Sequence, residues 1–407
     1  MFRRALFGAS ASLPLALSPQ PKAVAQTRQG QPPARVPARP APPPTTPAQS
    51  PIGPVETIAR FALVVDFETG VTLLSKQAEE RMPPASMSKL MTMYVVFEQL
   101  KRGHLRMDQM LTVSDTAWRM GGSRMFLERN STASVEDLTR GVIVQSGNDA
   151  CIVLAEGISG SERAFAETMN TLGREIGLTS SVFRNSTGWP DPEHRMTARD
   201  LATLARRIIL DHPDYYRFYG ERSFRWNNIT QENRNPLLGR VNGADGLKTG
   251  HTEEAGFGLT ASVKRGDRRL ILVVGGLPSM RARGEEAERL IEWGFREFDN
   301  VVLFRAADTI EEVPVYLGDR PTVPLVGGRD VVATVPRGWR ETLQARVRFE
   351  APITAPVVKG QEIGALEVSG RGVPAMTMPL YAGADVDRLG LVARIPAVIS
   401  RMLSRGN

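Results

Sequence analysis

The sequence has few of the residues that stabilise disulfide-bonded or metal-dependent proteins. It holds one cysteine, Cys151, so no disulfide can form within the chain. Four histidines are present, and none stands at a metal-ligand spacing such as His-x-x-x-His. We therefore expect neither a metal ion nor another cofactor. Cys151 lies in the apolar run 150–154 and is expected to be a buried structural thiol.

The start of the sequence lacks an apolar segment long enough to span a membrane. Residues 5–17 are mostly apolar but too few for a span. Arg3 and Arg4 precede them, and the small-residue site 23–25 follows, which is the order of an export signal. We predict a signal peptide over residues 1–25. Its removal takes three basic residues and no acidic one, so the formal charge falls from +7 to +4.

Basic tracts interleaved with aromatic residues are also missing, so no nucleic-acid partner is expected. What the chain does have near its start is proline. Ten of its 29 prolines lie between Pro32 and Pro54, among Ala, Arg, Gln and Thr. Such a stretch cannot bury a core and favours extended conformations. We predict a linker over residues 26–54.

Hydrophobic patterns predict one α/β domain over residues 55–300, with strands at both ends and helices between them. The first and the last hairpin are therefore expected to share a sheet. The expected strands are 61–66, 71–74, 257–264 and 269–275, and the expected helices are 86–101, 135–158 with a break at 146–148, 163–176, 197–210 and 284–298.

After residue 300 the pattern changes to short β-rich runs separated by Gly, Pro and Asp, such as 312–317 and 345–349. These runs predict a small all-β domain over residues 301–385. Nothing in it is catalytic by residue type.

The last segment, residues 386–407, has the pattern of a basic amphipathic helix. We predict that it attaches the protein to a membrane surface, with packing against the β domain as the alternative. Pro396 would kink the helix in either case. One side of the helix would carry Val392, Ile395, Val398, Ile399, Met402 and Leu403, and the other Arg394, Arg401 and Arg405.

Three short motifs carry the chemistry. In Ser86-Met87-Ser88-Lys89, a serine and a lysine three residues apart share a helix face, so the amine can take the hydroxyl proton if its pKa is lowered. Ser146-Gly147-Asn148 interrupts a helical region, and Lys248-Thr249-Gly250 stands on an expected strand edge. Each motif is common by chance. Together, in this order, they are the set found in β-lactamases and penicillin-binding proteins.

The residues around the motifs make the similarity more specific. The blocks 84–92, 144–151 and 245–252 closely resemble the active-site blocks of the serine D-alanyl-D-alanine carboxypeptidases, the low-molecular-mass penicillin-binding proteins. The resemblance is strong over about residues 55–300, includes 226–235, and is looser in the C-terminal half. It implies an antiparallel sheet with helices on both faces and a helical subdomain, followed by a small all-β domain and a C-terminal amphipathic helix.

The same resemblance implies a role for each motif residue. Ser86 would be the acylated nucleophile and Lys89 its general base. Ser146 would handle a proton, and Asn148 would hold the substrate amide. Lys248, Thr249, Gly250 and His251 would contact the substrate, and the backbone N–H groups of Ser86 and His251 would form the oxyanion hole. Arg283 would bind the terminal carboxylate of the substrate, with the neighbouring Arg281 as the alternative.

The implied substrate is a peptidoglycan pentapeptide ending in D-Ala-D-Ala, and β-lactams are the implied covalent inhibitors. An exported enzyme of this kind would be periplasmic, attached peripherally to the outer face of the inner membrane. Three alternatives remain: a peptidoglycan endopeptidase, a β-lactamase and a non-catalytic envelope scaffold. A class A β-lactamase would need a Glu-x-x-x-Asn motif, which is not found between residues 180 and 200.

Overall fold

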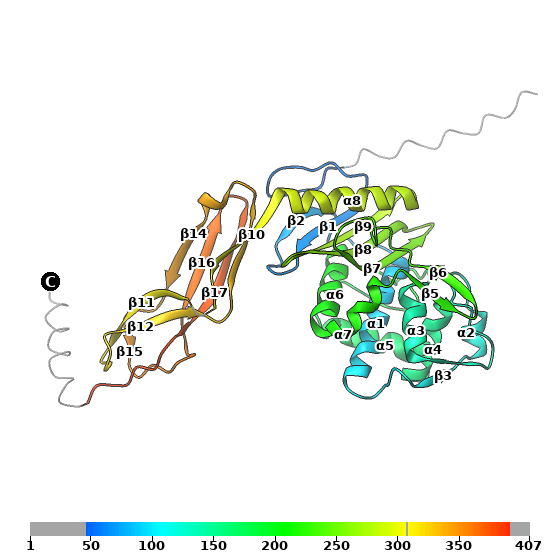
Figure 1. The fold of residues 1–407 in the computed structure, drawn as a ribbon, viewed down its shortest axis with the longest axis horizontal. Helices are drawn as coiled ribbons and strands as arrows, with labels where there is room; N and C mark the ends of the chain where they lie inside the picture. The colour runs from blue at the N-terminus through cyan, green and yellow to red at the C-terminus, as the bar shows by residue number, and fades with distance from the viewer. Residues whose placement is uncertain (1–45, 307, 391–407) are drawn as a thin grey trace, which may run out of the picture. The chain divides into compact units, whose positions relative to one another are not determined.

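The computed structural model describes residues 46–306 and 308–390 (Figure 1). The predicted signal peptide, most of the predicted linker and the tail after residue 390 lie outside the described residues. Among the described residues, no helix is long and apolar enough to cross a membrane.

The core of the first domain is a five-stranded sheet in the order β2-β1-β9-β8-β7, in which every neighbouring pair is antiparallel. β1 pairs with β9, so the first and the last hairpin share one sheet, as predicted. β7 forms one edge of the sheet. The strands are β1 (Phe61–Asp66), β2 (Thr72–Lys76), β7 (Ala244–Thr252), β8 (Gly256–Arg265) and β9 (Arg268–Leu277).

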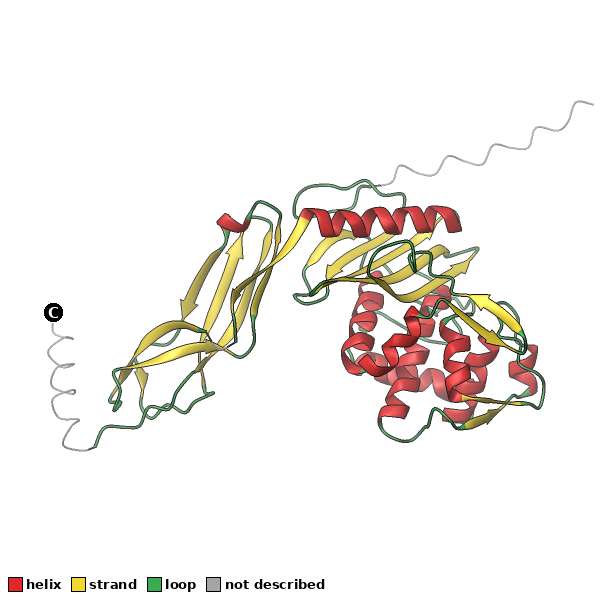
Figure 2. Cartoon of the chain, viewed as in Figure 1, coloured by secondary structure: helices red, strands yellow, loops and turns green. Residues whose placement is uncertain are grey.

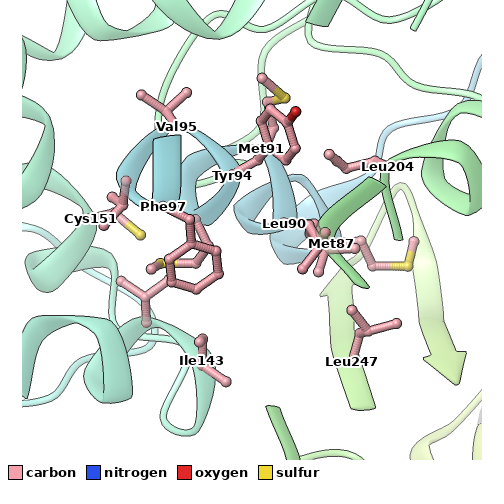
Figure 3. Packing of buried hydrophobic residues seen from close by; sticks show 14 of the residues in the cluster. Met87, Leu90, Met91, Tyr94, Val95, Phe97, Ile143, Cys151, Leu204 and Leu247 are labelled. Carbon is pink, nitrogen blue, oxygen red and sulfur yellow. The ribbon is translucent and has the colours of Figure 1, made fainter. Parts of the chain in front are cut away.

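Helices cover both faces of this sheet (Figure 2). Successive residues of a strand point to opposite faces, and in β1 they join different cores. Val64 packs in a cluster with Leu290 and Ile291 of α8 (Met280–Glu297). Leu63 packs in a second cluster, which contains α1 (Lys89–Lys101) and α6 (Ala198–Asp211). Figure 3 shows that α1 is surrounded by apolar side chains, among them the buried thiol of Cys151.

A helical subdomain stands between β2 and β7 in the sequence. The predicted break at 146–148 separates α3 from α4, so the serine and the asparagine of the second motif lie where one helix ends and the next begins. The elements of this region are β3 (Met110–Thr112), α2 (Asp115–Arg119), β4 (Thr132–Ser134), α3 (Val135–Ile143), α4 (Asn148–Ser159), α5 (Glu162–Glu175), α7 (Pro213–Tyr216), η2 (Arg217–Gly220), β5 (Ser223–Trp226) and β6 (Ile229–Glu232).

Two helix starts differ from the sequence prediction. α8 begins at Met280 rather than Gly284, because the Ser279 hydroxyl accepts the N–H of Ala282 and caps the helix earlier. Arg283 was expected just before this helix and instead lies in its first turn. The helix predicted from residue 86 begins as a 3₁₀ turn, η1 (Ala85–Ser88), which continues directly into α1.

Both ends of the predicted first domain also differ. Ala48 and Gln49, which fall in the predicted linker, form β-bridges with Val55 and Ser75. At the other end, β10 (Phe298–Phe304) runs through the predicted boundary at residue 300 and pairs with β13.

The C-terminal domain is all-β apart from one short 3₁₀ turn, η3 (Arg340–Thr342). Its main sheet has the order β14-β16-β17-β12-β11-β15, and β10 and β13 form a second sheet. Val386 bridges to Val357, so the predicted tail segment starts within this domain. The strands are β11 (Thr309–Tyr316), β12 (Thr322–Gly327), β13 (Val331–Pro336), β14 (Gln344–Arg348), β15 (Ile353–Thr354), β16 (Glu362–Gly370) and β17 (Val373–Ala382).

Candidate active site

The fold brings the three sequence motifs to one cavity of about 320 Å³. Ser86 comes from η1, Ser146 from the α3–α4 break, and Thr249 from the edge strand β7. All nine predicted site residues either line this cavity or hydrogen-bond a residue that does. The lining residues are Ser86, Ser123, Ser146, Arg234, Thr249, Gly250, His251, Phe257, Met280 and Arg283.

β7 can approach η1 closely because residue 250 is a glycine. A Cβ atom on Gly250 would lie 2.8 Å from the carbonyl oxygen of Pro84 and 3.1 Å from the backbone nitrogen of Met87. Any side chain would push the strand away from the turn that carries Ser86. Gly250 therefore sets the width of the site as well as lining it.

Lys89 is fully buried and joins three segments of the chain. Its Nζ donates to Ser86 Oγ at 2.8 Å, to Asn148 Oδ1 at 2.7 Å and to the carbonyl oxygen of Thr187 at 2.6 Å. Burial is the main reason why the pKa of Lys89 falls to about 8. When neutral, the amine keeps two N–H donors for Asn148 and Thr187 and can turn its lone pair to the Ser86 hydroxyl. The geometry is that of a serine with its base.

Lys248 forms a second lysine–serine pair. Its Nζ donates to Ser146 Oγ at 2.9 Å and to the carbonyl oxygen of Thr249 at 3.2 Å. Burial and then the charge of Lys89 hold the pKa of Lys248 well below its usual value. Because Lys248 is hydrogen-bonded to the Ser146 hydroxyl, which lines the cavity, a proton can pass between the amine and the cavity through Ser146.

The amide of Asn148 is held from both sides, since its Oδ1 accepts from Lys89 and its Nδ2 donates to the carbonyl oxygen of Gly121 at 2.8 Å. The next residue, Asp149, accepts the N–H groups of Met125 at 3.0 Å and Leu127 at 3.1 Å. These bonds attach the loop 120–127 to the start of α4. The loop in turn places Ser123 in the cavity wall.

Arg283 is buried in the first turn of α8, and its Nη2 donates to the carbonyl oxygen of Arg234 at 3.3 Å. Burial lowers the pKa of Arg283 to about 10, and the charge of Arg234 adds to this effect. Arg281, by contrast, is exposed and pairs with Glu285 at 2.7 Å. The structure therefore separates the two predicted candidates, because only Arg283 lines the cavity.

Arg234 is a site residue to which the sequence prediction gave no role, although it lies in the block 226–235 that is part of the resemblance. It follows β6 in a loop with no periodic pattern, and its guanidinium donates to Ser123 Oγ. Burial lowers its pKa as well. In the described parts of the chain, neither Arg234 nor Arg283 forms an ion pair with a carboxylate. Arg283 is buried and Arg234 is exposed, and both line the cavity together with Thr249. Two guanidinium groups beside a hydroxyl suit a bound carboxylate.

His251 lines the cavity at the end of β7, next to Phe257. Its ring stacks on Phe257, with 3.8 Å between the ring centroids, at the point where β7 and β8 pair. The stack fixes the end of β7 beside the cavity. In the described parts of the chain, no group of three metal-ligating side chains is found.

Comparison with known proteins identifies relatives of both domains. Residues 45–279 match the family model described as D-alanyl-D-alanine carboxypeptidase, and residues 298–388 match the one described as penicillin-binding protein 5, C-terminal domain. The chain is 39% identical over 345 residues to the D-alanyl-D-alanine carboxypeptidase DacC of Escherichia coli. The alignment covers 83% of this chain and 86% of that protein.

Two solved structures show the same fold. Penicillin-binding protein 5 from Haemophilus influenzae has a TM-score of 0.77 and 38% identity, covering 82% of this chain and 99% of that one. Penicillin-binding protein D2 from Listeria monocytogenes, in its ampicillin-bound form, has a TM-score of 0.55 and 30% identity. That match covers 59% of this chain and 98% of the other.

The lowered pKa of Lys89 gives a prediction for pH dependence. Because the base must be neutral to take a proton, the second-order rate constant for acylation by a penicillin should rise about tenfold per pH unit and level off above about pH 8. Arg234→Gln removes a positive charge that lowers this pKa, so the rising limb should shift to higher pH. Stopped-flow or quenched-flow acylation across pH 6–10 measures this rate constant for the wild type and for the variant. An unshifted limb in the variant would contradict this electrostatic coupling.

Proposed function

The chain belongs to the D-alanyl-D-alanine carboxypeptidase family, and we propose that it removes the terminal D-alanine of peptidoglycan stem peptides through an ester on Ser86. The observation that carries this proposal is the hydrogen bond of 2.8 Å from the fully buried Lys89 to Ser86. It gives the hydroxyl a base that is partly neutral near physiological pH. The enzyme is a serine-type hydrolase.

Acylation begins when neutral Lys89 takes the proton of the Ser86 hydroxyl. Oγ then bonds to the carbonyl carbon of the penultimate D-alanine, and the carbonyl oxygen becomes an oxyanion. The backbone N–H groups of Ser86 and His251 are the proposed donors to this oxyanion, one from η1 and one from β7. The close approach of these two elements at Gly250 supports that assignment.

The tetrahedral intermediate collapses when the C–N bond to the terminal D-alanine breaks. The leaving nitrogen takes a proton from the Ser146 hydroxyl, and Ser146 is reprotonated by Lys248, 2.9 Å away. Water then attacks the ester carbonyl, the bond to Ser86 Oγ breaks, and Oγ takes back the proton that Lys89 holds. The shortened peptide leaves as a carboxylate, and the proton lost by the water replaces the one that Lys248 gave up. A β-lactam acylates the same serine.

The terminal carboxylate of the substrate has its own proposed site, made by Arg283, Arg234 and Thr249. All three line the cavity. Charge-assisted hydrogen bonds from a guanidinium to a carboxylate are stronger than neutral ones. The free carboxylate of a peptide ending in D-Ala-D-Ala therefore provides the negative charge that this end of the cavity lacks.

The location of the enzyme is proposed from its sequence. The export signal predicted over residues 1–25 and the basic amphipathic pattern after residue 386 support a periplasmic enzyme attached peripherally to the outer face of the inner membrane. All residues of the proposed site lie within residues 46–390, so the site contains no part of that tail.

Ser86→Ala tests the nucleophile directly. Intact-mass analysis after incubation with penicillin should show one added penicillin on the wild-type protein and none on the variant, because the ester cannot form without Oγ. Wild-type protein should also shorten a pentapeptide by one alanine, which mass spectrometry detects. A labelled Ser86→Ala protein that is correctly folded by circular dichroism would contradict the assignment.

Arg283→Gln should lower kcat/KM for a D-Ala-D-Ala peptide by about a hundredfold, since it removes a charged hydrogen-bond donor from the carboxylate site. Arg281→Gln is the matched control, because Arg281 is two residues away and exposed. Steady-state kinetics on both variants measure the difference. Equal losses in the two variants would show that Arg283 does not bind the carboxylate.

Deleting residues 391–407 should move the protein from the membrane fraction to the soluble fraction. The cut leaves Val386 and Arg388, which form β-bridges with the β domain, in place. Fractionation of cells and co-sedimentation with anionic vesicles measure the attachment, and penicillin labelling controls for folding. A truncated protein that labels normally and still sediments with membranes would disprove the anchor.

A further inference from the structure

Trp189 is a large aromatic side chain that the proposed reaction leaves without a role. It is 46% exposed, although it lies only one loop away from the base Lys89. It lines a small crevice of about 10 Å³ together with Pro84, Ala85, Thr252 and Glu254. An exposed tryptophan at the mouth of a catalytic site is a candidate contact for a substrate.

Asn185 makes four hydrogen bonds to the backbone of the loop that carries Trp189. Oδ1 of Asn185 accepts the N–H groups of Thr187 at 3.2 Å, Gly188 at 2.8 Å and Trp189 at 3.0 Å, and its Nδ2 donates to the carbonyl oxygen of Trp189 at 3.0 Å. Because Thr187 also accepts a hydrogen bond from Lys89, the loop that supports the base also fixes the backbone of Trp189.

Close packing adds to this constraint. Gly188 has a φ of +75°, and a Cβ there would lie 1.9 Å from the carbonyl oxygen of Ala85, next to the nucleophile. The Trp189 ring itself covers a second glycine, since a Cβ on Gly122 would lie 3.1 Å from its Cζ3 and 2.8 Å from Nδ2 of Asn148. The ring is therefore placed beside the Asn148 amide with much of its surface still exposed.

The direction of β7 indicates which part of a substrate reaches Trp189. Thr249 lies with the arginines in the carboxylate site, whereas Thr252 lines the Trp189 crevice. Three residues of a strand span about 10 Å. β7 is an edge strand, so a peptide can lie along it. With its carboxylate at Arg283, such a peptide extends the residues before the two D-alanines along β7 toward Thr252 and the exposed ring of Trp189.

We propose that Trp189 forms the wall of an acyl-side subsite and packs against the aliphatic side chain of the residue that precedes D-Ala-D-Ala. This inference rests on the proposed function. A rigid aromatic face offers a long methylene chain a large apolar contact at little entropic cost. Trp189 is thereby a specificity-determining residue: it favours stem peptides with a long side chain at this position over those with a short one.

The test compares two peptides in three proteins. The peptides are diacetyl-L-lysyl-D-alanyl-D-alanine and acetyl-L-alanyl-D-alanyl-D-alanine, which differ in side-chain length at the position in question. The proteins are the wild type, Trp189→Ala and Trp118→Ala, all as the full mature chain. Trp118 is the control because it is also partly exposed, on α2, and does not line the cavity or the crevice. The readout is the ratio of kcat/KM for the two peptides.

The wild type should prefer the lysyl peptide. Trp189→Ala should reduce the ratio about tenfold, and Trp118→Ala should leave it unchanged. If Trp189→Ala lowers kcat/KM for both peptides by the same factor, the ring only supports the loop and the subsite is disproved. If the wild type hydrolyses neither peptide, the proposed function fails. Trp189→Phe keeps an aromatic ring, so its kcat/KM ratio should be close to that of the wild type. A ring that only supported the loop would not affect this ratio.

Discussion

The arrangement of the site depends on the amine of Lys89, which is buried and has no carboxylate within ion-pair distance in the described parts of the chain. A buried amine needs hydrogen-bond partners, and this one finds them on three segments: Ser86 of η1, Asn148 of α4 and Thr187 of the loop after α5. Loss of any one segment would leave a buried polar group unsatisfied. The amine of Lys89 thus holds η1, α4 and the loop after α5 together next to the nucleophile.

A second consequence is electrostatic. Burial is the largest cause of the lowered pKa values of Lys89, Lys248 and Arg283, and the charge of Arg234 lowers all three further. Lys89 and Arg283 also lower the pKa of Lys248. Such a concentration of positive charge opposes folding and is retained at functional sites. An anionic ligand relieves the repulsion, so the same charges that destabilise the empty site strengthen the binding of a peptide carboxylate. This links the low pKa of the base to the recognition of the substrate.

Much of this could be predicted from the sequence, because it depends on local patterns. The hairpins follow from apolar runs separated by turn residues, and the start of α6 follows from its cap, where Thr197 Oγ1 accepts the N–H of Asp200 at 3.0 Å. The sequence prediction starts α8 at Gly284, whereas the Ser279 hydroxyl caps the helix and starts it at Met280. No role could be given to Arg234 or Trp189, since loops without periodicity bring them to the site only after the chain has folded. The block 226–235, which contains Arg234, is nevertheless part of the resemblance.

The two serine–lysine pairs also differ in how far apart their members are in the sequence. Ser86 and Lys89 are three residues apart on one continuous stretch, whereas Ser146 and Lys248 are 102 residues apart and come from the helical subdomain and the sheet. A slight opening between these two layers would stretch the second pair first and leave the first intact. Protonation of the leaving amine is therefore the step most sensitive to such an opening, whereas attack by Ser86 does not depend on it. The nitrogen of a strained lactam stays attached to the acyl group after the ring opens. Acylation by a lactam therefore depends less on the Ser146–Lys248 pair than acylation by a peptide does.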